Sequence, residues 1–287
     1  MWRDDPELVH RLAPTGRRIL AAFEARLDSH GLLGPMTGWN FLDWVGAPGW
    51  VNGVPPGGLS GPSASLHWSF ACGLRWMAEI ESALNEPEFE ARWLRKRSEA
   101  AKAAEVFFDS KRNLYADDLE KRHFSEHAQA LAILSGALDH ERESLLATGL
   151  EGGGGTLAPA SIYFGHYVLE ALATTDRHTA FFHRLGEWNR LAEAGLKTPR
   201  ESPEPSRSDC HGWGSHPIHH AFASILGIQP AAPGFRKVRV RPMPLPEGWG
   251  PLRATLPHPR GEIQMETDGH GRVIKFRAPV GVERVEG

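Results

Sequence analysis

The chain has 287 residues, enough for one large domain with a smaller one beside it, and a formal net charge of -3 without a long run of Lys or Arg. This charge balance excludes the electrostatic footprint of a protein that binds nucleic acid or an anionic membrane, so we expect a neutral or polar partner. The sequence has no signal-peptide pattern and no apolar stretch long enough to cross a bilayer, which predicts a soluble, cytoplasmic protein. Cys72 and Cys210 are expected to be buried thiols without a disulfide.

Apolar residues recur at helical spacing over most of the chain. The first segment, residues 6–27, contains Pro14 and is predicted as one kinked helix or two short ones. Ser125, followed by Glu126 and Gln129, has the pattern of a helix N-cap. The other helical segments are expected at residues 64–84, 87–108, 125–138, 140–149, 159–173, 179–194 and 211–226.

Two segments interrupt the helical pattern. Residues 30–63 are rich in Gly and Pro and carry Trp39, Trp44 and Trp50, while the run Gly152–Gly155 predicts a flexible break between two helix pairs. The first segment is too long and too aromatic for a simple connector. Loops of this kind often build a site on a rigid scaffold.

After Pro230 the pattern changes to short alternating runs, separated by Pro, Gly and an Asp-Gly-His-Gly turn. Such runs are typical of short strands joined by tight turns, and they predict a small antiparallel β module. We therefore expect a domain of helical hairpins over residues 1–229 and a β domain over residues 230–287.

The aromatic loop contains a candidate sugar-binding surface. Pyranose rings present C–H patches that aromatic rings can cover, and carboxylates bind the hydroxyl groups. Asp43 lies between Trp39 and Trp44, which suits both kinds of contact. An equally weighted alternative is that both indoles belong to the core and that Asp43 caps a neighbouring helix.

A second candidate cluster lies between Glu201 and Trp213, where several ionisable residues crowd into one loop. Such crowding shifts pKa values. If Glu201 lies near a sugar, it could activate a water molecule, as the base of an inverting glycosidase does. The alternative is that the charges only pair with one another, with Arg207 bound to Asp209 or Glu204, and we favour it for Arg207 and Asp209.

Other chemistries have little support in the sequence. The histidines at positions 211, 216, 219 and 220 are not assigned as a helical ligand pair, and no cysteine cluster accompanies them, so we expect no metal site. The chain has no Walker loop, no dinucleotide-binding glycine motif and no nucleophile elbow. We expect no cofactor.

Three segments carry a resemblance to a known family: WNFLDW at residues 39–44, FSEHAQALAILSG at residues 124–136, and residues 163–235, which include SRSDCHGW and ILGIQPAAPGF. In these segments the chain resembles the bacterial α-L-rhamnosidases of glycoside hydrolase family 78 and their six-hairpin relatives. The resemblance implies a mainly α fold, an (α/α)6 toroid of helical hairpins followed by a small antiparallel β-sandwich. It also implies inverting hydrolysis of terminal α-L-rhamnosyl residues.

The resemblance assigns roles to individual residues. It makes Glu201 the general base and His211 a residue that lines the sugar pocket, and it implies that Trp213 helps to close the pocket. Residues for substrate recognition would be Trp39, Asp43 and Trp44. The expected partner is a small molecule or oligosaccharide that bears rhamnose.

One departure from the family pattern bears on activity. In the family, an acidic segment upstream of the first helix seen here supplies the general acid. This chain has about eight predicted helical segments, whereas a closed toroid needs twelve. We therefore expect an N-terminally incomplete toroid with weak or no activity by itself. Two alternatives stay open: a non-catalytic carbohydrate-binding or scaffold protein, and another six-hairpin enzyme acting on uronates, with Arg207 as the carboxylate clamp.

Overall fold

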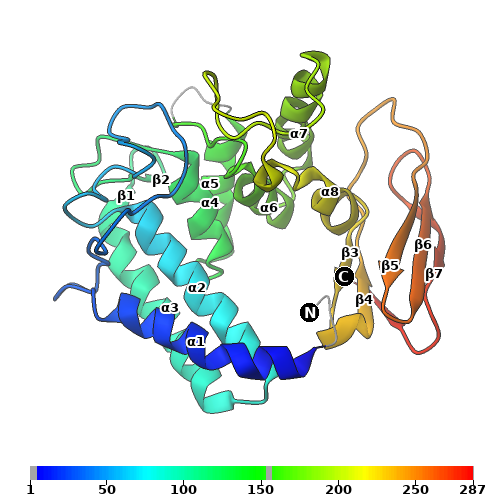
Figure 1. The fold of residues 1–287 in the computed structure, drawn as a ribbon, viewed down its shortest axis with the longest axis horizontal. Helices are drawn as coiled ribbons and strands as arrows, with labels where there is room; N and C mark the ends of the chain where they lie inside the picture. The colour runs from blue at the N-terminus through cyan, green and yellow to red at the C-terminus, as the bar shows by residue number, and fades with distance from the viewer. Residues whose placement is uncertain (1–4, 153–156, 287) are drawn as a thin grey trace.

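The computed structural model describes residues 5–152 and 157–286. Helices come first along the chain and the larger strands come last (Figure 1). Of the predicted break Gly152–Gly155, residues 153–155 lie outside the described residues. The α-helices are α1 (Pro6–Glu24), α2 (Ala64–Ala83), α3 (Pro87–Ala104), α4 (Glu126–Leu134), α5 (His140–Glu151), α6 (Gly165–Thr174), α7 (His178–Glu193) and α8 (Pro217–His220).

Most helices lie where the apolar periodicity predicts them, with two differences. Helix α6 begins at Gly165, because the backbone N–H groups of Ala160 and Ser161 bind the carboxylates of Glu126 and Asp43 instead of joining a helix. The predicted segment 211–226 is divided into a 3-10 turn η2 (Gly212–Gly214), helix α8 and a π-helical turn η3 (Ala221–Ile225). Pro217, which lacks an N–H group, occupies the first turn of α8.

Helix α1 runs as one element through Pro14 and is capped by Asp5, whose Oδ1 accepts a hydrogen bond from the Leu8 N–H at 2.9 Å. The predicted cap at Ser125 is confirmed, since its side chain accepts a bond from the Ala128 N–H. All nine residues of α4 are buried, and this helix packs against α2, α5 and α6. Helix α4 is therefore at the centre of the helical core.

The helices follow one another around an arc that begins at α1 and ends at α8, and the later strands continue from there (Figure 1). The start of α1 lies close to a 3-10 turn, η4 (Pro233–Phe235). Asp5 and Pro6 line the same cavity, of about 820 Å³, as Pro233 and Arg236. Residues 30–63 are irregular, as the sequence predicts, and the segment between α1 and α2 lies at one end of these helices (Figure 1).

In the part of the chain that the structure describes, the strands form three small sheets, and one of them is a two-stranded hairpin that was not predicted. The sheet β5-β6-β7 is antiparallel, as predicted, and β3 pairs antiparallel with β4, whereas the pair β4–β8 is parallel, which the sequence did not predict. The chain forms the sheet β5-β6-β7 after β4, and β8 then pairs with β4 in the parallel direction. The strands are β1 (Phe108–Asp109), β2 (Leu114–Tyr115), β3 (Ile228–Pro230), β4 (Lys237–Val240), β5 (Arg253–His258), β6 (Gly261–Thr267), β7 (Val273–Arg277) and β8 (Glu283–Glu286).

One apolar cluster joins the two later sheets, because Ile228 and Val238 from one sheet are buried together with Ile263 and Met265 from the other. The predicted boundary between residues 229 and 230 falls inside β3, which pairs with β4. Strand β3 therefore belongs with the β part of the chain.

Gly227 makes the turn between the π-helical turn η3 and β3. Its φ is 62°, and a Cβ at this position would lie 1.9 Å from the carbonyl oxygen of Arg241. Any larger residue would clash with backbone that cannot move aside without shifting the segment after β4. This glycine thus sets how closely the end of the helical part packs against the β part.

The two cysteines differ in environment. Cys72 is buried and free, as predicted, and burial raises the pKa of its thiol to about 12. Cys210 is exposed, so the prediction that it is buried is wrong; it lies on the surface loop that precedes η2.

Among the helices of the described residues, none combines the length and the apolar character needed to cross a bilayer.

Candidate functional site

Asp43 is the buried anchor of the aromatic loop. Its side chain is fully enclosed, and Oδ2 accepts hydrogen bonds from the Ser161 N–H at 2.8 Å and from His127 Nε2 at 2.7 Å. The Ser161 hydroxyl donates to Oδ1, as does the Trp44 N–H. Asp43 thus ties the loop to α4 and to the segment before α6. This structural role resembles the alternative interpretation, in which Asp43 caps a neighbouring helix. A contact between Asp43 and a sugar stays a prediction.

The aromatic residues around Asp43 form a continuous patch of rings. Trp39 is 62% exposed, and its ring lies 4.8 Å from that of Phe41 and 5.7 Å from that of Trp44, measured between ring centroids. The Nε1–H of Trp39 donates to the Asn52 carbonyl oxygen at 2.9 Å, which fixes the indole while its face stays open. Trp39 is therefore not a core residue.

Ring contacts continue from this patch to the second predicted cluster. Phe41 stacks on Tyr163 with ring centroids 6.3 Å apart, and Tyr163 lies 5.0 Å from Trp213. Trp213 in turn lies 4.8 Å from His211. These contacts join three segments far apart in sequence into one surface, which we call the aromatic wall: Trp39, Phe41, Trp44, Tyr163, Trp213 and His211.

The loop that carries Glu201 is closed by its own backbone. The Glu201 N–H donates to the Ser208 carbonyl at 2.8 Å, and the His211 N–H donates to the Pro199 carbonyl at 2.9 Å. These bonds bring the two ends of the loop together, so that the backbone at residue 201 lies beside the backbone near residue 211. The Glu201 side chain is 5% exposed as a result.

Glu201 forms an ion pair with Arg207 within this loop. Arg207 donates from Nε to Oε2 at 3.2 Å and from Nη2 to Oε1, which gives a two-pronged ion pair. Hydrogen bonding to Arg207 holds the pKa of Glu201 below its usual value, and the pKa of Arg207 is raised in return. His211 Nε2 lies 3.9 Å from Oε1, within ion-pair range but too far for a hydrogen bond.

The pairing of Arg207 differs from the sequence-based interpretation. We expected Arg207 to bind Asp209 or Glu204, but Glu204 binds Arg200 at 2.7 Å and the Arg207 fork goes to Glu201. A sequence cannot rank three nearby carboxylates for one guanidinium, because the choice depends on how the loop folds back. The loop closure described above places Glu201 within reach.

The structure brings most of the predicted site residues together. Successive contacts link Trp39, Trp44, Trp213, His211 and Glu201, whereas the Asp43 side chain is fully buried. Sequence reasoning missed Phe41 and Tyr163. The available signal was their position inside the two segments WNFLDW and YFGHYVLEAL, both already singled out for other residues.

A second cluster lies outside the aromatic wall; two of its residues, His216 and His220, were considered from the sequence and rejected as metal ligands, and the third, His166, was not named. One nitrogen from each of His166, His216 and His220 lies within 4.8 Å of the other two. His216 and His220 are four residues apart, the spacing that places two side chains on one face of a helix, so the prediction that these histidines form no helical ligand pair is wrong. His166 comes from α6, more than forty residues earlier in the chain.

Several solved structures share the fold of this chain, among them the following three. The GH78 family rhamnosidase of Bacillus sp. GL1 matches all of this chain with a TM-score of 0.83 and 20% sequence identity. A rhamnosidase from Klebsiella oxytoca with rhamnose bound matches 76% of the chain at a TM-score of 0.63 and 19% identity. The α-L-rhamnosidase of Aspergillus terreus matches 92% at a TM-score of 0.71 and 14% identity.

The chain shares its fold with part of the α-L-rhamnosidases. The expected resemblance to these enzymes is thereby confirmed for the fold, while identities of 14–20% leave activity and site roles as proposals. The chain spans 31%, 42% and 32% of the three solved chains. Comparison with protein-family models and with curated protein sequences gives no match.

Proposed function

We propose that this chain forms part of a glycoside hydrolase of the α-L-rhamnosidase type, which removes terminal α-L-rhamnosyl residues with inversion at the anomeric carbon. The observation that carries the proposal is the continuous aromatic wall that leads from the exposed Trp39 to the enclosed carboxylate of Glu201. The rhamnosidase fold of the similar structures, one of which is described with rhamnose bound, supports the choice of sugar.

In this proposal the aromatic wall binds the sugar through its C–H faces. Trp39 supplies an open indole face, and Trp44 and Trp213 extend the apolar surface toward the reacting carbon. The Nε1–H groups of Trp44 and Trp213 have no hydrogen-bond partner among the described residues. These donors are available to sugar hydroxyls after a small movement of the rings, since buried polar groups gain from being paired.

Glu201 is proposed as the general base. Its carboxylate takes a proton from a water molecule while the water oxygen bonds to the anomeric carbon, and the glycosidic C–O bond breaks on the opposite face. The lowered pKa of Glu201 keeps the carboxylate ionised at neutral pH, the state that a base requires. Because the Arg207 side chain is 75% exposed, it can swing away from Glu201 when substrate enters.

The proposed reaction also needs a general acid that protonates the departing oxygen. In inverting enzymes the two carboxyl groups stand about 6.5–9.5 Å apart, which leaves room for the water molecule. We assign the acid role to none of the carboxylates in the described residues. We therefore propose that this chain by itself is weak or inactive. Activity would belong to a longer rhamnosidase-type protein that contains this chain, which we call the complete gene product.

The finer architecture is also part of the proposal. We propose that α1 to α8 correspond to hairpins of an (α/α)6 toroid and that the two later sheets form a β-sandwich. The shared apolar cluster of Ile228, Val238, Ile263 and Met265 supports the second point, because two sheets that pack face to face bury one common core. The cytoplasmic location likewise stays a prediction.

The experiment compares hydrolysis of an aryl α-L-rhamnoside by the complete gene product with hydrolysis by its Glu201→Gln variant. We expect kcat to fall by about 10²–10⁴-fold, because the amide cannot accept a proton from water. Glu204→Gln is the matched control, since Glu204 is an exposed glutamate of the same loop, and it should keep activity. Full activity of the Glu201→Gln variant would overturn the assignment of the base.

A second function is favoured by one observation, namely that both oxygens of Glu201 are already engaged by Arg207. A carboxylate held in this way suits a carbohydrate-binding protein that has lost catalysis. Calorimetric titration with rhamnose separates the two functions. Binding that Glu201→Gln leaves unchanged, together with no turnover by the complete gene product, would favour the binding protein over the enzyme.

A further inference from the structure

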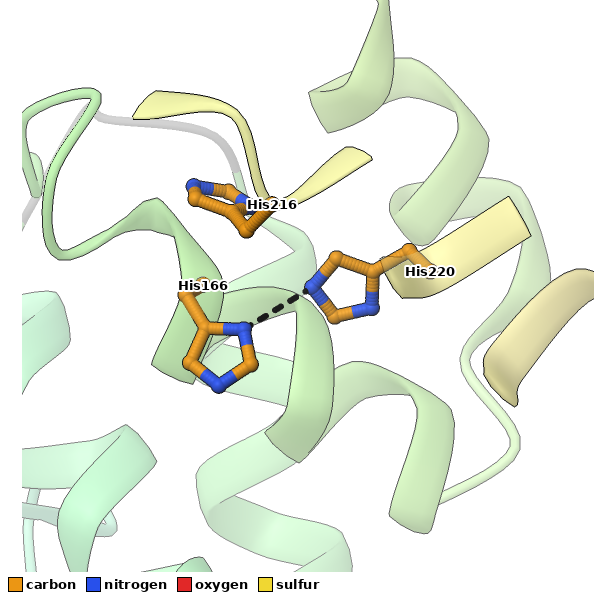
Figure 2. A group of neighbouring side chains, drawn as sticks. All are labelled: His166, His216 and His220. Atoms are coloured by element: carbon orange, nitrogen blue, oxygen red, sulfur yellow. Dashed lines mark hydrogen bonds between the residues drawn. The ribbon is translucent and has the colours of Figure 1, made fainter. Parts of the chain in front are cut away.

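The three histidines of the second cluster surround a common point. His166 reaches it from α6, and His216 and His220 reach it from the start and the end of α8 (Figure 2). The ring centroids form a nearly regular triangle, with separations of 5.4 Å for His166–His216, 5.5 Å for His216–His220 and 5.2 Å for His166–His220. Three imidazole ligands around one ion have this spacing, but His219 lies at similar centroid distances, 5.6 Å from His166 and 5.3 Å from His220, so the ring nitrogens decide which residues share a point.

The hydrogen bond of His216 fixes where its proton is. Nε2 lies 3.0 Å from the carbonyl oxygen of Ile162, and because a carbonyl only accepts, Nε2 must carry the hydrogen. The other nitrogen, Nδ1, then presents a lone pair. It is buried and has no partner among the residues that the structure describes. A buried acceptor without a donor is costly unless something else pairs with it.

The remaining two histidines face each other through ring nitrogens. His166 Nδ1 and His220 Nε2 are 3.2 Å apart (Figure 2), and the other nitrogen of His220, Nδ1, lies 2.9 Å from the Ser224 hydroxyl. Two nitrogens bound to one tetrahedral zinc ion, each at about 2.0–2.1 Å, would lie about 3.4 Å apart. The pair is therefore already at the separation that a shared ion requires.

Without an ion, a proton on His166 Nδ1 can satisfy the contact with His220. That hydrogen bond explains two of the three residues but leaves the lone pair of His216 unpaired. A cation at the common point accounts for all three. The ring nitrogens that face away from it include His216 Nε2 on a backbone carbonyl and His220 Nδ1 on a hydroxyl, which is the outer-shell bonding that orients metal-bound imidazoles.

We propose that His166, His216 and His220 form a site for a divalent transition-metal ion, with zinc as the representative ion. Imidazole nitrogens suit ions of this class, and three protein ligands leave a fourth position for water or another ligand. Binding requires a small inward movement of the His216 ring, because the three ligand atoms are within 4.8 Å of one another rather than at bonding separation.

The protonation states agree with the geometry. Burial lowers the pKa of His216 to about 4 and the pKa of His220 to about 2, and the pKa of His166 is lowered for the same reason. All three rings are therefore neutral at pH 7 and have lone pairs to offer. Glu170 lies nearby, with Oε1 3.7 Å from His220 Nδ1, and adds negative charge at the edge of the site.

Glu170, His219 and His220 could also hold an ion. That group is less suited to the role, because His219 is exposed and its Nε2 lies 3.2 Å from Glu170 Oε1, an ordinary pair that needs no metal. The two groups share His220, so one ion would occupy one or the other. The unpaired nitrogen of His216 favours the group with His166.

A metal at this point would connect α6 to helix α8, which begins four residues after Trp213. The proposal rests on the histidine geometry and does not depend on the proposed glycosidase activity. Its expected consequence is mechanical: the ion braces the segment that carries His211 and Trp213 against the helical core. A metal that stabilises the fold binds only the folded chain and raises its midpoint of thermal unfolding.

The test titrates the chelator-treated chain with Zn²⁺ by calorimetry and with Co²⁺ by visible absorption. We expect one equivalent of Zn²⁺ to bind and Co²⁺ to give the intense visible bands of a tetrahedral site. His216→Ala should weaken binding by about 100-fold or more, and Ser224→Ala by about 10–100-fold through the lost outer-shell contact. His183→Ala, which removes an exposed histidine of α7, should change nothing.

Absence of a stoichiometric Zn²⁺ site and of the Co²⁺ bands in the unmodified chain would overturn the proposal, and this result requires no variant to fold. Unchanged affinity in a folded His216→Ala variant, checked by circular dichroism, would overturn it as well. A loss of affinity in His219→Ala but not in His166→Ala would assign the ion to the neighbouring group and contradict the site proposed here.

Discussion

Arg207 binds both carboxylate oxygens of Glu201, with Nε at 3.2 Å from Oε2 and Nη2 on Oε1. The exposed guanidinium thus covers a carboxylate that is otherwise enclosed at the end of the aromatic wall. The pair sets the charge state of Glu201, because the hydrogen bonds favour its ionised form. It also makes Arg207 a group that substrate must displace to reach the proposed base.

Replacing Arg207 by Ala should move the acidic limb of the pH–activity profile to higher pH. The folded-state pKa of Glu201 is lowered chiefly by Arg207, so removing the guanidinium raises that pKa and the base becomes protonated at a higher pH. The measurement is kcat/KM against pH for the complete gene product. Arg200→Ala, which removes the partner of Glu204, serves as the control and should leave the limb in place.

Trp39→Ala should raise KM for the rhamnoside by about 2–10-fold, since an aromatic contact contributes about 0.5–1.5 kcal/mol beyond the area it buries. The fold should tolerate the change, because the indole is 62% exposed. Trp76→Ala is a matched control, as Trp76 is 42% exposed on α2, outside the aromatic wall. An unchanged KM would remove Trp39 from the proposed binding surface.

Asp43→Ala should lower the free energy of unfolding by about 3–5 kcal/mol. The substitution leaves the Ser161 N–H and His127 Nε2 without their buried acceptor, and it detaches the aromatic loop from α4. Urea denaturation checks the loss. Asp209→Ala, at an exposed aspartate, should stay within about 0.5 kcal/mol of the unmodified chain. Equal stability of the two variants would contradict the role of Asp43 as an anchor.

The metal-free chain should lose stability as the pH falls from about 7 to 5. The pKa of His216 is about 4 and that of His220 about 2 in the folded chain, both below the ordinary value of 6.5, so the unfolded chain binds more protons in this range. Each histidine then contributes about 2 kcal/mol of lost stability over that interval. His216→Asn should reduce the pH dependence measured by urea denaturation, and an unchanged dependence would contradict the assignment.

The sequence by itself determined the elements whose causes are local. Apolar residues at helical spacing gave the approximate bounds of α1, α2 and α5, because a helix that packs on a core must present one apolar face. The cap at Ser125 was also readable, since the capping hydroxyl and its N–H partner are three residues apart. The Gly- and Pro-rich loop could be singled out as a candidate site, since its aromatic residues have no helical face to occupy.

Only the tertiary structure decided which distant side chains meet. Asp43 and Ser161 are 118 residues apart, and His166 and His220 are 54 apart, so no spacing rule connects either pair. The partner of Arg207 was equally open, because three carboxylates lie within a few residues of it and the backbone closure of the loop selects Glu201. Local interactions act along the chain and leave a sequence pattern, whereas these contacts depend on how the helices pack and the loops return.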